Sequence, residues 1–172
     1  MSNEVDRYAS LIQLLGEIDK AWNAEANVAA LAMVYIGIDT MALLACPVGE
    51  PSQKDTDFIT WVDQYLKAEP ASEYQYEGID VYAARCAVLH SYGSVAKLHR
   101  KANPPRMFGY TDDGPHRKDD AGRLVIISVA VLIYDFRKAM AKFVTEIWAN
   151  PELKRRVDSR MDSLLFAGLI EH

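Results

Sequence analysis

Apolar residues recur with helical spacing along most of this chain, and groups of turn residues separate the segments in which they do so. In residues 5–22 the apolar positions that fall on one face are Leu11, Leu14, Leu15, Ile18 and Trp22. Residues 27–45 are apolar on nearly every side, and Asn27 is a residue type that caps helices. This second segment is followed by three residues that interrupt helices, Pro47, Gly49 and Pro51. The pattern predicts two helices over these ranges.

Two more helices are predicted before residue 93. Asp55 or Thr56 can cap a third helix. Its apolar stripe consists of Phe58, Ile59, Val62, Tyr65 and Leu66. Residues 68–78 form a loop, and a fourth helix runs from about Ile79 to Tyr92 and ends before Gly93.

The stretch from residue 94 to residue 122 is rich in proline and glycine and reads as irregular. Residues 106–110 and 123–128 flank its acidic turn region and contain β-branched or aromatic residues, which allows a small β-hairpin. Residues 124–136 can equally begin a helix. From Ala130 onward the apolar spacing is helical.

A last helix is predicted from the residues that precede it. Asn150 offers a capping side chain, Pro151 suits the first helical position, and Glu152 lies near the positive end of the helix dipole. This helix should extend to about Phe166. The pattern as a whole predicts an all-α fold, a bundle of about six helices in a single domain over residues 1–172, with room for one small β-hairpin in residues 105–128.

Composition supports one globular, cytoplasmic domain. The chain has 172 residues, of which 50% are hydrophobic and 25% are charged, so it can bury a sizeable core without disulfides. Its two cysteines, Cys46 and Cys86, lie in apolar runs, where free thiols behave as small hydrophobes. The acidic, polar N-terminus has neither the basic start nor the apolar stretch of a signal peptide.

Residues 28–46 are long and apolar enough to suggest a membrane span. However, Asp39 lies near their centre and no basic residue flanks them. A carboxylate at mid-bilayer costs about 2.5–3.5 kcal/mol even on a lenient insertion scale. We therefore expect a buried core helix and no membrane contact.

The net charge of −5 is unevenly divided between the two halves of the chain. Residues 1–84 carry 4 Lys or Arg against 14 Asp or Glu, whereas residues 85–172 carry 15 against 10. This asymmetry has two interpretations. The two halves can mediate self-association or present one face to an anionic partner, or folding can mix the charges across the surface.

The fourth predicted helix contains polar residues that need a partner or a cleft. Its interior is apolar apart from Asp80, Arg85 and His90. Buried charges are costly unless they are paired or hydrogen-bonded. Five residues rotate a helix by roughly 500°, so the side chains of Arg85 and His90 should leave it about 140° apart. We expect them to converge only if the helix ends near residues 91–93 or if a second subunit completes the site.

Arg85 followed by His90 resembles the R-x(4–6)-H signature of the HEPN superfamily. The resemblance implies a helical bundle, a homodimer, and a cleft at the dimer interface where the arginine and histidine of both subunits meet. Many members of that family are metal-independent endoribonucleases of stress or defence systems, so RNA and an antitoxin-like partner protein are the implied partners. In such a reaction His90 would transfer a proton, and Arg85 would hold the phosphate through its planar donor fork.

The segment after this helix is basic, and four of its cations are candidate RNA-binding residues: Lys97, Arg100, Lys101 and Arg106. Aromatic residues lie among them, as in surfaces that bind single-stranded nucleic acid. The alternative is an ordinary solvated loop. We expect no cofactor and no metal, because the histidines show no ligand spacing typical of zinc.

A structural interpretation of Arg85 and His90 stays open. Arg85 can pair with a carboxylate such as Asp39, Asp63 or Asp80 across the bundle, and His90 can bond to a neighbouring helix end. The protein would then be a noncatalytic helical interaction module that binds a partner protein or a nucleotide. Sequence alone therefore leaves it uncertain whether this protein is an enzyme.

Overall fold

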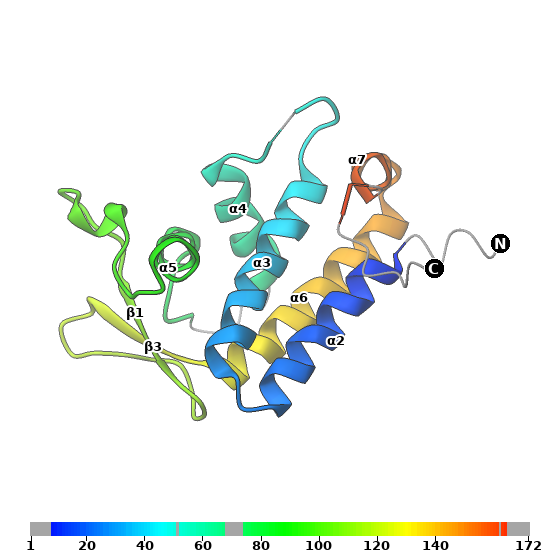
Figure 1. Cartoon of the computed structure of the whole chain (residues 1–172). Coiled ribbons are helices and arrows are strands. Elements are labelled where there is room, and N and C mark those ends of the chain that lie inside the picture. Colours follow the sequence, from blue (N-terminus) through cyan, green and yellow to red (C-terminus); the bar gives the residue numbers. More distant parts are fainter. Residues whose placement is uncertain (1–7, 51, 68–73, 162, 165–172) are drawn as a thin grey trace.

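The computed structural model describes residues 8–50, 52–67, 74–161, 163 and 164, which fold mostly into helices with one small sheet (Figure 1). The α-helices are α2 (Ala9–Asn23), α3 (Asn27–Ala45), α4 (Asp55–Trp61), α5 (Gly78–Ser91), α6 (Val129–Ala149) and α7 (Pro151–Met161). A π-helix, η1 (Val62–Leu66), continues α4, and a 3₁₀-helix, η2, spans Lys97–Arg100. The strands are β1 (Met107–Thr111), β2 (Arg117–Lys118) and β3 (Leu124–Ser128). A mostly helical fold with about six helices is thus confirmed for the described residues, but the sheet makes all-α too narrow a class.

The central element is α3, which packs against α2, α4, α5, α6 and α7 (Figure 1). Because α3 is apolar on nearly all sides, a central position buries much of it, although Val28 and Ile36 stay partly exposed. At Gly37 an added Cβ would lie 2.4 Å from the ring of Phe136 on α6, so these two helices approach closely there. By length and hydropathy alone α3 could cross a membrane, but half of that stretch is buried inside the domain.

Aromatic side chains fill the core between α4, the π-helix and α6. The rings of Tyr65 and Phe143 lie 5.2 Å apart, and those of Trp61 and Phe143 lie 6.1 Å apart, both in edge-to-face geometry. Such pairs contribute roughly 0.5–1.5 kcal/mol beyond the burial of their area. The phenol of Tyr65 also donates to the Glu146 carboxylate at 2.9 Å, which ties the π-helix to α6.

The strand pairing differs from the expected hairpin. Strand β1 pairs in parallel with β3, with Met107 opposite Leu124, whereas β2 pairs antiparallel on the other side of β3. The two apolar pieces predicted to form the arms of a hairpin are therefore neighbours that run in the same direction. The polar connection supplies the antiparallel strand, so the prediction located the sheet correctly but its pairing was wrong.

Ser128 marks the change from strand to helix that the sequence left open. It is the last residue of β3 and the N-cap of α6, and its Oγ accepts a hydrogen bond from the Val131 amide at 3.3 Å. Its own amide donates to Nδ1 of His116 at 3.0 Å. Residues 124–128 are thus a strand, and the helix begins at Val129, one residue before the predicted start.

The remaining helix bounds lie close to those predicted. The second, fourth and last predicted helices correspond to α3, α5 and α7, with starts that agree to within a residue. The first begins at Ala9, and residues 5–7 of its predicted range lie outside the described residues. The last is helical to Met161, and of its predicted remainder residues 162, 165 and 166 also lie outside them.

Candidate functional site

Helix α5 holds the candidate site, and both of its ends are well defined. At the start, Glu77 and Asp80 form a capping box, in which the Asp80 carboxylate accepts the Glu77 amide at 2.9 Å. At the end, Tyr92 adopts a left-handed conformation with φ 49° and ψ 38°, and the amide of Gly93 donates to the carbonyl of Ala87 at 3.1 Å. This closure is a Schellman-type cap, in which the left-handed position is usually glycine. The helix therefore stops one residue after His90.

Arg85 is held by Asp39 of α3. Its Nε donates to Oδ2 of Asp39 at 2.7 Å, and its Nη2 lies 2.6 Å from the same oxygen. The other Asp39 oxygen accepts the side-chain amide of Gln53 at 2.7 Å. Among the three carboxylates that the sequence offered to Arg85, the structure thus selects Asp39.

The Arg85–Asp39 pair lies between core and surface. The side chains of Arg85 and Asp39 are 20% and 18% exposed. Burial alone would lower the pKa of Arg85, but the hydrogen bond to Asp39 and its negative charge outweigh burial and raise that pKa. The guanidinium is consequently a fixed positive charge that solvent can still reach.

The third guanidinium nitrogen of Arg85 meets His90. Nη1 of Arg85 lies 3.2 Å from Nε2 of the imidazole. Because arginine can only donate, Nε2 is the acceptor in this arrangement and the ring hydrogen is on Nδ1. The His90 side chain is exposed, so the two residues share a position that solvent reaches.

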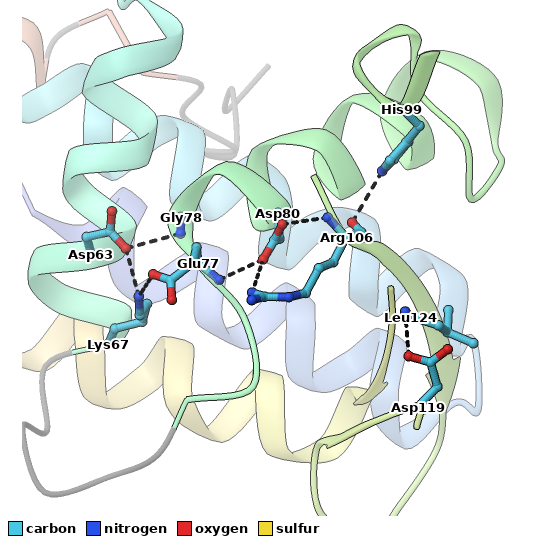
Figure 2. A network of polar contacts seen from close by, with 9 residues as sticks. All are labelled: Asp63, Lys67, Glu77, Gly78, Asp80, His99, Arg106, Asp119 and Leu124. Atoms are coloured by element: carbon cyan, nitrogen blue, oxygen red, sulfur yellow. Dashed lines mark hydrogen bonds and ion pairs between the residues drawn. The ribbon is translucent and has the colours of Figure 1, made fainter. Parts of the chain in front are cut away.

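The basic segment after α5 is folded back against the start of that helix, as Figure 2 shows. The Asp80 carboxylate, 3% exposed, accepts the Arg106 amide at 2.7 Å and Nη1 of its guanidinium at 2.9 Å. His99 accepts the Ala96 amide at 2.9 Å through Nδ1, and its Nε2 lies 3.3 Å from the Arg106 carbonyl. These contacts fix the path of the segment from one end of α5 to the other.

Of the four predicted RNA-binding cations, Arg106 is therefore committed to Asp80. Since Asp80 precedes His90 by ten residues, the Arg106 anchor lies about 15 Å along the helix axis from His90. Lys97, Arg100 and Lys101 are exposed and have no ion pair with any residue that the structure describes.

Asp63, the third carboxylate considered for Arg85, has another role. Its Oδ1 accepts the Gly78 amide at 3.1 Å and lies 3.2 Å from the amine of Lys67 (Figure 2). It therefore stabilises the entry into α5 and does not approach Arg85.

A further histidine, His116, lies in a partly buried cluster that sequence reasoning did not single out. Nε2 of His116 is 3.6 Å from the Asp135 carboxylate, and the rings of His116 and Tyr76 are 5.7 Å apart. Burial, followed by the charge of Asp135, raises the pKa of Tyr76 well above its ordinary value. Since Nδ1 of His116 binds the start of α6, we interpret this cluster as structural. No group of His, Cys, Asp and Glu within the described part of the chain is arranged to hold a metal ion.

Tyr92 is the residue at the candidate site that sequence reasoning missed. It is 78% exposed and lies two residues after His90. A large aromatic side chain in the left-handed region is uncommon, and residues in such conformations concentrate at functional sites. The signal in the sequence was a tyrosine directly before the glycine that follows the predicted helix.

Comparison of the chain with protein-family models, with curated proteins and with solved structures found no significant match to any of them.

Proposed function

We propose that this protein is an HEPN-like, RNA-binding protein and a metal-independent endoribonuclease of a stress or defence system. The observation that carries the proposal is the contact of 3.2 Å between Nη1 of Arg85 and Nε2 of His90, at a solvent-exposed position. The R-x4-H spacing of the sequence supports it independently.

The chemistry of these two residues suits cleavage of RNA through the neighbouring 2′-hydroxyl. A phosphodiester oxygen that approaches Arg85 would replace the imidazole as the acceptor of the Nη1 hydrogen. Nε2 of His90 would then be free to take the proton of the 2′-hydroxyl as a general base. The 2′-oxygen would attack the phosphorus, the bond from phosphorus to the 5′-oxygen would break, and the imidazolium would return its proton to that leaving oxygen. Asp39 would hold the guanidinium in place while negative charge develops on the phosphate.

Further parts of the proposal concern binding and assembly. Lys97, Arg100 and Lys101 are exposed cations that can contact the RNA backbone, and their contribution should weaken as salt rises. Arg106 would act mainly by fixing the segment that carries them. We also propose a cytoplasmic homodimer in which the sites of both subunits cooperate, together with an antitoxin-like partner protein that controls it.

The direct test is cleavage of a labelled single-stranded RNA in the presence of EDTA. We expect the wild-type protein to cleave, and His90→Ala to lose about 10²–10⁴-fold in rate, the usual contribution of a general base. Arg85→Lys keeps a positive charge opposite Asp39 but removes the planar fork, so it should also cleave slowly. Arg155→Ala, an exposed arginine on α7, is the matched control and should cleave like the wild type. Equal rates for wild type and His90→Ala would refute the assignment.

The ion pair between Arg85 and Asp39 favours a second candidate function, that of a noncatalytic interaction module that binds a partner protein or a nucleotide. Two of the three guanidinium nitrogens of Arg85 contact Asp39, which is the arrangement of a structural arginine. In that case Arg85→Lys would lower the unfolding midpoint, and neither wild type nor any variant would cleave RNA. The cleavage assay and a urea titration of the same proteins therefore separate the two functions.

A further inference from the structure

A hollow of about 520 Å³ opens beside the C-terminal end of α5. Its walls come from the first turns of α3, the end of α5, strand β1 and the start of α6. Its apolar lining consists of Val28, Leu31, Val88 and Val129. Two aromatic side chains, Tyr92 and Tyr110, complete it. A pocket of this size and character suits a flat, largely apolar group.

The pocket continues the face of α5 that carries the candidate site. Arg85 and Val88 are spaced i and i+3 on α5, which places them on one face of the helix, and Tyr92 follows directly after the helix as its left-handed cap. Val88 and Tyr92 line the pocket, and Arg85, which contacts His90, lies about one turn before Val88 on that face. A chain bound by its phosphate at Arg85 can therefore place a neighbouring group in this pocket.

The polar rim of the pocket includes two acceptor oxygens, beside the hydroxyls of Tyr92 and Ser94, which can donate or accept. The side-chain amide of Asn27 donates to Oδ1 of Asp112 at 2.8 Å. This leaves Oδ2 of Asp112 and the amide oxygen of Asn27 without a hydrogen-bond partner among the described residues. The Tyr110 hydroxyl is already bonded to that of Tyr35 at 2.8 Å. A ligand group here gains most if it presents N–H donors, and the Asp112 carboxylate disfavours an anion.

We propose that this pocket binds a base of the RNA strand and prefers guanine, an inference that rests on the proposed function. Bases stack on aromatic side chains and are recognised through hydrogen bonds to their edges. Guanine presents two adjacent donors, N1–H and the N2 amino group, which match the carboxylate oxygen of Asp112 and the amide oxygen of Asn27. Uracil presents a single N–H between two carbonyl oxygens, and those oxygens face the carboxylate unfavourably.

The test is a titration of the protein with guanosine 5′-monophosphate and, separately, with uridine 5′-monophosphate, followed by ¹H–¹⁵N NMR. We expect the guanine nucleotide to bind about tenfold more tightly, since a hydrogen bond to a charged group is worth roughly that factor. Asp112→Asn should reduce the ratio of the two affinities to near one. Asp113→Asn, the same change at the adjacent exposed residue, lies outside the lining of the pocket and should leave the ratio unchanged.

Equal affinities in the wild type, or equal effects of the two variants, would overturn the inference. The outcome is separable from that of the proposed function. If the protein cleaves RNA but shows no base preference, the proposed guanine pocket is wrong and the proposed ribonuclease function stands. If the protein prefers guanine through Asp112 but does not cleave RNA, the proposed guanine pocket is supported and the proposed catalytic function is wrong.

Discussion

Removing the Asp80 carboxylate should destabilise the protein more than any change at its surface. This side chain is 3% exposed and accepts three hydrogen bonds, from the amides of Glu77 and Arg106 and from the Arg106 guanidinium. Asp80→Ala would leave the two amides without their acceptor and Arg106 without its counter-charge. Leaving a buried donor unpaired costs about 1–3 kcal/mol, so the two amides together lose about 2–6 kcal/mol, whereas Arg106, 31% exposed, can be hydrated.

The measurement is urea unfolding followed by far-UV circular dichroism. With a typical dependence on urea, a loss of that size lowers the unfolding midpoint by roughly 2 M. Asp80→Asn keeps the side-chain volume and one acceptor oxygen, so its unfolding midpoint should lie between those of Asp80→Ala and the wild type. Asp120→Asn, an exposed acid in the turn after β2, is the control and should change the free energy of unfolding by less than about 0.5 kcal/mol.

A double-mutant cycle with Arg106→Met tests whether the ion pair causes the loss. Once Asp80 is gone, Arg106 has no partner to lose, so the double variant should be less destabilised than the two single variants added together. We expect a coupling of about 1–3 kcal/mol. A loss below about 1 kcal/mol for Asp80→Ala, or strict additivity in the cycle, would show that these contacts do not anchor the segment before β1.

Two further predictions concern the glycines of α2 and α3 and the two cysteines. Gly37→Ala should lower the melting temperature, because its Cβ would meet the Phe136 ring and overpacking costs about 1–3 kcal/mol. Gly16→Ala in α2 is the control: its Cβ meets nothing within 4 Å, so this change should raise the melting temperature. Shifts of the same sign for both variants would contradict the packing of α3 on α6. Burial raises the pKa of the Cys46 thiol to about 11 from 9.0, so at pH 8 its thiolate fraction should be about a hundredfold below that of an ordinary cysteine. When the folded protein is treated with iodoacetamide, mass spectrometry should find the label on the half-buried Cys86 first. Faster labelling of Cys46 would contradict this prediction.

The helices could be predicted because their signals are local. Apolar spacing, Asn27 and the Asn150-Pro151 pair lie within a few residues of the boundaries they determine. The pairing of the strands could not be predicted, because it depends on contacts between residues far apart in the sequence. A strand at residues 107–111 can pair with residues 124–128 in either direction, and the parallel arrangement becomes visible only in the folded chain.

The candidate site was predicted only in part, for a related reason. Sequence identified Arg85 and His90 and offered three carboxylates for Arg85, but only the packing of α5 on α3 selects Asp39. The hydrogen bonds of Asp80 to Arg106 span 26 residues, so charge counting alone placed Arg106 with the free cations of its segment. A positive charge in a sequence does not show whether that charge is already neutralised in the fold.

The helical angle between Arg85 and His90 suggested that they diverge, but this angle describes Cα–Cβ directions and not the ends of side chains. Arginine is long enough to bend around a helix, and α5 ends one residue after His90, which leaves the imidazole unobstructed. Asp39 takes Nε and Nη2 and thereby turns Nη1 toward His90. The structural interpretation of Arg85 and the proposed function are therefore compatible, because the ion pair that joins α5 to α3 also leaves Nη1 facing His90, where the proposed reaction would bind the phosphate.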